Sequence, residues 1–162
     1  MTDISTLHGR AAEVRAYLCG NLAGQHLRIL RSFPSGCCKV ASLLLLQWLH
    51  DKEGVRDGFG VAWARRPNPR TPGTDATHFW LEVGGVIIDI TADQFDDCGE
   101  SVHVSQDRDW HDTFSGSSRF PQHELTPLTG EYMREYQAMV AHLDRADNPP
   151  VDHSAGTTRA SR

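Results

Sequence analysis

The fold of this chain is decided by the stretch THFWLEVGGVIIDIT, residues 77–91. Two runs rich in β-branched and aromatic residues, 77–83 and 86–91, lie on either side of the pair Gly84-Gly85. Such runs predict strands, and a Gly-Gly pair between them predicts a two-residue turn because glycine accepts positive φ at both central positions. We therefore expect an antiparallel hairpin.

The turn also determines which side chains of the hairpin share a face. It pairs Val83 with Val86. Counting outward, Trp80 lies opposite Asp89, and His78 is the diagonal neighbour of Asp89 on the same face, at roughly 7–8 Å. A carboxylate among β-branched neighbours is costly without a partner. We therefore expect His78 and Asp89 to pair.

A second stretch, FPSGCCKVAS at residues 33–42, predicts a cysteine at the start of a helix. The turn at 33–36 interrupts the preceding segment, and 37–52 carries a wide apolar face that is typical of a buried helix. The positive end of a helix dipole and its unpaired N–H groups favour a thiolate. The same N–H groups can stabilise the oxyanion that forms when a thiolate adds to a carbonyl.

A thiol, an imidazole and a carboxylate from these two stretches would form a nucleophile, a base and an orienting group. Taken singly, each residue has a simpler interpretation. Most free cysteines are small buried hydrophobes, and a lone histidine or aspartate is commonly a core residue or an ion-pair partner. The coincidence of all three on compatible elements favours an active site, in which Cys38 is the preferred nucleophile and Cys37 the alternative.

These motifs resemble those of the papain-like and transglutaminase-like cysteine enzyme superfamily. GCCKVAS, residues 36–42, is similar to the papain-type pattern Gly-x-Cys-x-x-x-Ser. Residues 78–83, followed by 89–91, resemble the transglutaminase-like pattern His-x-Trp-x-Glu-x followed by Asp-x-Thr. Small bacterial leader peptidases of lasso-peptide pathways belong to the same superfamily and have a similar His-x-Trp-x-Glu stretch.

The resemblance implies a role for each matching residue. Cys38 would be the nucleophile, His78 the general base and acid, and Asp89 the residue that orients the histidine. Papain-type enzymes place an oxyanion-donating glutamine ahead of the cysteine, and Ser32 stands at the matching offset in this chain. Trp80 is expected to be a wall of the substrate site because it shares a face with His78.

Other polar residues near these motifs receive simpler interpretations. Asp93 and Gln94 are expected to be loop caps, although an amide at that place could help to stabilise an oxyanion. Trp110, His111 and His123 are expected on loops, without a direct role in the site.

Composition narrows the class of protein. The chain has 162 residues, 39% hydrophobic and 23% charged, which fits one globular domain. Its net charge of −5 argues against a nucleic-acid partner. The longest apolar stretch, 40–49, is too short to span a membrane, and no secretory signal is visible, so we expect a cytoplasmic protein with no membrane partner. The four cysteines lack the spacing of a zinc site, so we expect free thiols, no metal and no cofactor.

The expected fold class is α+β: N-terminal helices packed on a small antiparallel sheet in a papain-like or transglutaminase-like core. We expect a single domain over 1–146 and a disordered tail over 147–162. Periodicity and turn residues predict the further elements: one or two helices over 1–30, strands at 60–65 and 101–105, a loop at 67–75, an irregular segment at 106–128, and a helix at 131–146.

The sequence thus predicts a cysteine-dependent acyl-transfer enzyme that acts on peptide or amide bonds through a thioester at Cys38. Its substrate would be a peptide or protein, and its activity that of a peptidase, a deamidase or a transglutaminase. Two alternatives remain: a binding or regulatory module that has lost turnover, and a deamidating effector or toxin. The sequence leaves the substrate and the oligomeric state open.

Overall fold

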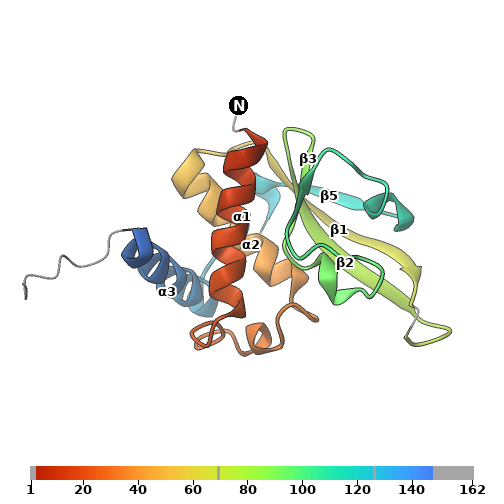
Figure 1. Cartoon of the computed structure of the whole chain (residues 1–162), viewed down its shortest axis with the longest axis horizontal. Helices are drawn as coiled ribbons and strands as arrows, with labels where there is room; N and C mark the ends of the chain where they lie inside the picture. The colour runs from red at the N-terminus through yellow and green to blue at the C-terminus, as the bar shows by residue number, and fades with distance from the viewer. Residues whose placement is uncertain (1–2, 69, 126, 148–162) are drawn as a thin grey trace, which may run out of the picture.

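The computed structural model describes residues 3–68, 70–125 and 127–147. The helices gather on one side of the molecule and the strands on the other, so the fold is α+β as expected (Figure 1). The helices are α1 (Ile4–Cys19), α2 (Cys38–Glu53) and α3 (Gly130–Asp147). The tail was expected to be disordered over 147–162: Asp147 is instead the last residue of α3, and 148–162 lie outside the described residues.

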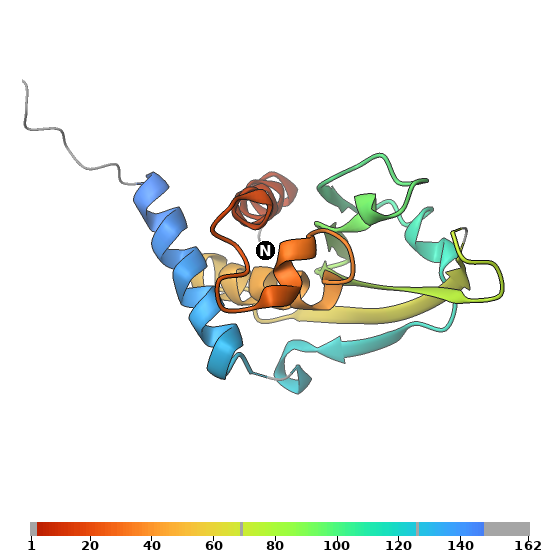
Figure 2. The ribbon, with the colours of Figure 1, turned by 90° about the horizontal axis from the view of Figure 1, so that it is seen from below.

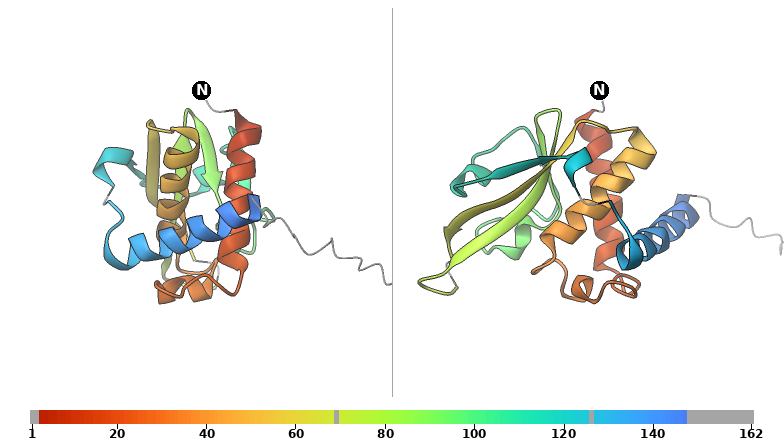
Figure 3. Two further views of the ribbon diagram at one scale, coloured as in Figure 1. Left: turned by 90° about the vertical axis from the view of Figure 1, so that its left-hand side faces the viewer. Right: turned by 180° about the vertical axis from the view of Figure 1, so that it is seen from behind.

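Five strands form one antiparallel sheet in the order β4-β3-β2-β1-β5. Their bounds are β1 (Gly58–Pro67), β2 (Asp75–Val83), β3 (Val86–Asp89), β4 (His103–Ser105) and β5 (Ser118–Pro121). The two long strands, β1 and β2, extend away from the helices (Figure 3). Short 3₁₀ helices connect the main elements: η1 (Arg28–Ser32), η2 (Ala92–Gln94), η3 (His111–Thr113) and η4 (Gln122–Glu124).

The predicted hairpin is confirmed as β2 and β3. Val83 pairs with Val86, and both turn glycines have positive φ, 56° and 82°. On its other side, β2 pairs with β1, whose register shifts between Ala62 and Arg65. β1 therefore has one extra residue opposite His78. Such a bulge increases the local twist and re-aims neighbouring side chains.

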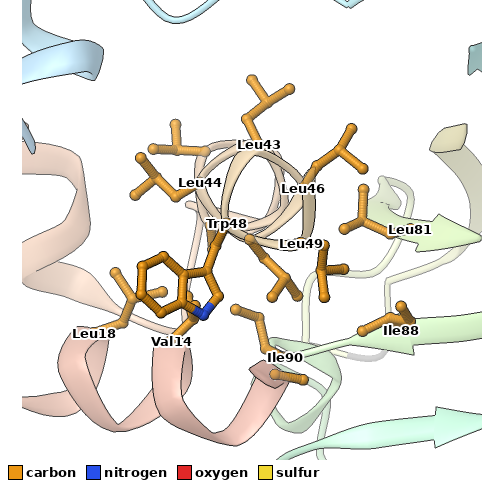
Figure 4. Close-up of a cluster of buried hydrophobic side chains, with 14 of the residues drawn as sticks. Val14, Leu18, Leu43, Leu44, Leu46, Trp48, Leu49, Leu81, Ile88 and Ile90 are labelled. Atoms are coloured by element: carbon orange, nitrogen blue, oxygen red, sulfur yellow. The ribbon is translucent and has the colours of Figure 1, made fainter. Parts of the chain in front are cut away.

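Helix α2 is the centre of the core. It lies between α1 and the sheet, and its leucines radiate around the helix axis (Figure 4). Trp48 and Leu49 are fully buried, and Trp48 lies beside Val14 and Leu18 of α1. A helix covered on most sides needs apolar residues around most of its circumference, which explains the wide apolar pattern of this segment. Helix α3 lies beyond α1 and α2, away from the sheet (Figure 2).

Two sequence expectations are corrected by the structure. Residues 20–30 do not form a second α-helix: they form turns and the start of η1, because backbone N–H groups of this segment bond the carboxylate of Glu135 instead of each other. The segment 106–128, expected to be irregular, contains β5, which pairs with β1 at the edge of the sheet.

None of the helices in the described part of the chain combines the length and the apolar character that a membrane span requires.

Candidate active site

Cys38 is the first residue of α2, and it is half-buried. Cys37, which precedes the helix, makes no side-chain hydrogen bond that caps it. The first backbone N–H groups of α2 therefore lack a side-chain cap near the Cys38 thiol. One turn later, the hydroxyl of Ser42 lies 3.5 Å from the carbonyl oxygen of Phe79. This contact holds the start of the helix beside β2.

His78 and Asp89 form a buried pair, as the hairpin register predicts. The Nε2 atom of His78 lies 2.5 Å from Oδ2 of Asp89, and neither side chain has exposed surface. The other carboxylate oxygen accepts hydrogen bonds from the backbone N–H and the hydroxyl of Thr91, at 2.9 and 3.2 Å. Because a carboxylate only accepts, Nε2 of His78 carries the proton in this bond.

The pair is held in its charged form. Burial opposes protonation of His78, but the charge and hydrogen bond of Asp89 outweigh it and raise the pKa of His78 to about 9. Burial likewise opposes ionisation of Asp89, yet the charge of His78 and the hydrogen bonds from His111 and His78 hold the pKa of Asp89 well below its usual range. At neutral pH the ring is thus an imidazolium beside a carboxylate.

The thiol of Cys38 meets the other nitrogen of the same ring. Cys38 is close enough to His78 to interact with its ring, and hydrogen bonding and charge from Cys38 raise the pKa of His78. Because Nε2 is taken by Asp89, Nδ1 is the ring nitrogen left for the thiol. The structure thus brings the three residues together in the order Cys38, His78, Asp89. This arrangement can hold a thiolate–imidazolium pair with the ring oriented by a carboxylate.

The two adjacent cysteines differ in their surroundings. Cys37 is 1% exposed, and its sulfur lies 3.5 Å from the carbonyl oxygen of Pro34. Burial, together with the neighbouring Cys38, raises the pKa of the Cys37 thiol to about 11. A buried thiol that resists ionisation is a poor nucleophile. Cys38, half-buried and interacting with His78, is therefore the better candidate.

His111 takes part in the site, although the sequence suggested no role for it. Its Nε2 atom lies 3.0 Å from Oδ2 of Asp89, and the residue is 1% exposed. Burial lowers the pKa of His111, so the ring is neutral and donates its Nε2 proton to the carboxylate. Its Nδ1 atom is buried and has no hydrogen-bond partner among the residues that the structure describes. Nothing in the sequence around Trp110-His111 signals this contact, because the loop is brought to Asp89 only by folding.

Gln94 also contacts the site. Its Nε2 atom lies 3.3 Å from Nδ1 of His78 and donates to the carbonyl oxygen of Thr91 at 2.9 Å. Its Oε1 atom accepts a hydrogen bond from the backbone N–H of Gly36 at 3.4 Å. Ser32, the residue expected at this place, is exposed in η1. The approach of Gln94 to His78 leaves the role expected for Ser32 without support.

Aromatic side chains enclose the His78 ring. The rings of Phe95, Trp110 and Phe114 have their centroids 5.1–5.8 Å from that of His78. Trp80 lies at 5.6 Å and is 2% exposed. The expectation that Trp80 forms a wall of the substrate site is therefore corrected. Trp80 is a buried core residue that packs with Ile87 and Phe114 on the face of the sheet that the helices do not cover. This apolar surrounding strengthens the buried ion pair.

His78, Asp89 and His111 are also the kinds of side chain that ligate metals, and one ligand atom from each lies within 4.8 Å of the other two. A tetrahedral zinc ion with bonds of about 2.0–2.1 Å would separate its ligand atoms by about 3.3 Å. Here both Nε2 atoms approach Asp89 Oδ2 more closely, at 2.5 and 3.0 Å. This spacing fits hydrogen bonds rather than coordination of a common ion.

In comparisons with known proteins, no family model, no curated protein and no solved structure matches the chain.

Proposed function

We propose that this protein is a cysteine-dependent acyl-transfer enzyme that acts on peptide or amide bonds. Cys38 is the nucleophile, His78 the general base and acid, and Asp89 the residue that orients the imidazole. We also propose that its core is of the papain-like or transglutaminase-like type, because a cysteine at a helix start is followed by a hairpin that carries the histidine and the aspartate.

One observation carries the proposal. The imidazole of His78 lies between the buried carboxylate of Asp89 and the thiol of Cys38 at the start of α2. A structural histidine needs no half-buried thiol on its second nitrogen. A nucleophile, a proton carrier and an orienting carboxylate in series are what acyl transfer to a thiol requires.

The chemistry follows from these contacts. The Cys38 thiolate adds to the carbonyl carbon of the substrate, and the electron pair of the C=O bond moves to oxygen. As this oxyanion collapses, the C–N bond breaks and Nδ1 of His78 gives its proton to the leaving nitrogen, which leaves a thioester on Cys38. Water or an amine then adds to the thioester while His78 takes its proton as base. The adduct collapses, the C–S bond breaks, and Cys38 leaves with the electron pair as a thiolate. Water would give hydrolysis or deamidation, and an amine would give transamidation.

Thiol alkylation tests the proposal. We expect iodoacetamide at pH 6 to label Cys38 at least about tenfold faster than the exposed Cys19 of the same molecule, because an ordinary thiol with a pKa of about 8.5 is mostly protonated there. Mass spectrometry of proteolytic peptides gives the rate at each cysteine. The advantage should disappear in His78→Gln and persist in Cys37→Ser.

Equal labelling of Cys38 and Cys19 in the wild type would overturn the proposal and favour a binding module that has lost turnover. Circular dichroism of each variant checks that it is folded, so that a lost rate reflects the missing side chain.

A further inference from the structure

We propose that Gln94 is a further catalytic residue: its side-chain N–H stabilises the oxyanion that forms when Cys38 adds to a carbonyl. This inference rests on the proposed function and deepens it. It assigns to a residue after the hairpin the role that the resemblance would place ahead of the cysteine.

The amide of Gln94 is held in one orientation by its two backbone partners. Its oxygen faces the N–H of Gly36, which can only donate, at 3.4 Å. Its nitrogen faces the carbonyl oxygen of Thr91, which can only accept, at 2.9 Å. The reverse orientation would set donor against donor and acceptor against acceptor. The amide therefore joins the loop just before Cys38 to the segment just after the hairpin.

The second N–H of this amide points at the reacting groups. Thr91 takes one hydrogen of Nε2, and the other faces Nδ1 of His78 at 3.3 Å. The thiol of Cys38 interacts with the same ring, and Nε2 of that ring is taken by Asp89. Nδ1, which the amide N–H approaches, is therefore the ring nitrogen left for the thiol.

The charge state of His78 decides what this N–H can do. In the thiolate–imidazolium pair, Nδ1 carries a proton and is a donor, so it cannot accept a hydrogen bond from Gln94. The N–H of Gln94 is then without an acceptor on the ring beside the attacking sulfur, and the oxygen of the tetrahedral adduct supplies one. The donor is thus available when negative charge develops on the substrate.

The start of α2 supplies a second donor. Its first backbone N–H groups, at Cys38 and beyond, have no side-chain cap. The positive end of the helix dipole favours an anion at the same place. Gln94 and the backbone of Cys38 would then hold the oxyanion from two sides, and the adduct would lose one of two donors when Gln94 is replaced.

Two electrophiles separate this role from a structural one. Iodoacetamide reacts with Cys38 by displacement of iodide, so no oxyanion forms. p-Nitrophenyl acetate reacts by addition to a carbonyl: the acetyl group moves to Sγ, and p-nitrophenolate leaves with its electron pair. We expect Gln94→Met to slow acetylation of Cys38 about 100-fold and to leave its alkylation by iodoacetamide within about threefold of wild type. Gln94→Glu, which replaces the N–H donors by oxygen at the same size, should lose acetylation in the same way.

Ser32→Ala is the matched control and should change neither rate. An equal loss of both reactions in the Gln94 variants would overturn the inference, because Gln94 would then only support His78. Unchanged acetylation would overturn it as well, and a selective loss in Ser32→Ala would return the role to that residue. Failure of the proposed function is distinguishable, since wild-type Cys38 would then show no His78-dependent alkylation.

Discussion

Asp89 accepts four hydrogen bonds, and each carboxylate oxygen takes two of them. Thr91 supplies two to Oδ1, while His78 and His111 each supply one to Oδ2. A buried carboxylate with every acceptor site in use has little freedom to rotate. Under the proposed function, His111 is therefore a positioning residue, because it holds the carboxylate that would orient His78.

Removing the hydrogen bond that His111 donates to Asp89 should lower the stability of the folded protein by a measurable amount. We expect His111→Leu to lower the free energy of unfolding by about 2 kcal/mol, because a hydrogen bond to a buried charge is lost. His111→Gln, whose amide can donate from nearly the same place, should recover most of it. Urea unfolding followed by circular dichroism gives both values, and the exposed His123→Leu should change stability by less than about 0.5 kcal/mol. If His111→Leu and His111→Gln lower the free energy of unfolding equally, the packing of the imidazole ring stabilises the fold and its hydrogen bond to Asp89 does not.

At the scale of elements, one carboxylate of α3 organises the connection between α1 and α2. Glu135 is fully buried and accepts from the backbone N–H groups of Gly24, His26 and Leu27 and from the hydroxyl of Tyr17. Burial, with the nearby Glu135, raises the pKa of Tyr17 and keeps this hydroxyl a donor. The turns that replace the expected second helix are thus satisfied by α3, and this segment leads into η1 and the start of α2.

Replacing one carboxylate oxygen of Glu135 by an amide nitrogen should destabilise the segment that connects α1 and α2. We expect Glu135→Gln to cost about 3 kcal/mol in the free energy of unfolding, because an amide nitrogen cannot accept from the two donors that face it. The amide protons of Gly24, His26 and Leu27 should also exchange faster with solvent, which NMR measures residue by residue. Glu131→Gln, on the exposed side of the same helix, is the control: it should change neither the free energy of unfolding nor the exchange of these amide protons. Unchanged protection in Glu135→Gln would contradict this role.

At the scale of the whole molecule, the sheet has two covered faces. Phe79, Leu81 and Ile88 belong to the core cluster formed with the helices, whereas Trp80 and Ile87 pack with Phe114 on the other side. The His78–Asp89 pair lies within this second layer and is shielded from water. Its ionisation is therefore linked to folding, because the unfolded chain exposes both groups to solvent.

This linkage predicts how stability changes with pH. The folded protein favours the protonated His78, whose pKa is raised to about 9 against the burial that opposes it. The resulting stabilisation is complete below the unfolded pKa of about 6.5 and is lost as pH rises through about 9. We expect the difference in unfolding free energy between wild type and His78→Gln to fall by about 2–3 kcal/mol from pH 6 to pH 10. Urea unfolding at each pH under reducing conditions measures it, with the exposed His8→Gln as control. A constant difference would mean that His78 is neutral in the fold.

The local elements of this protein follow from short stretches of its amino-acid sequence. The glycine pair and the alternating strands specify the hairpin and its register, and the register alone puts His78 and Asp89 on one face. The turn before Cys38 and the apolar run after it specify the start of α2. These features are readable because each depends on residues only a few positions apart, where backbone preference and side-chain periodicity act directly.

Which other side chains reach the site depends on long-range packing. His111 and Gln94 lie 22 and 16 positions from their partners Asp89 and His78, on short 3₁₀ helices with no periodic pattern. Strand β5 and the turns of 20–27 likewise form only where β1 and Glu135 supply hydrogen-bonding partners. Contacts of this kind depend on the global packing that brings distant segments together, and no local preference of the chain encodes them.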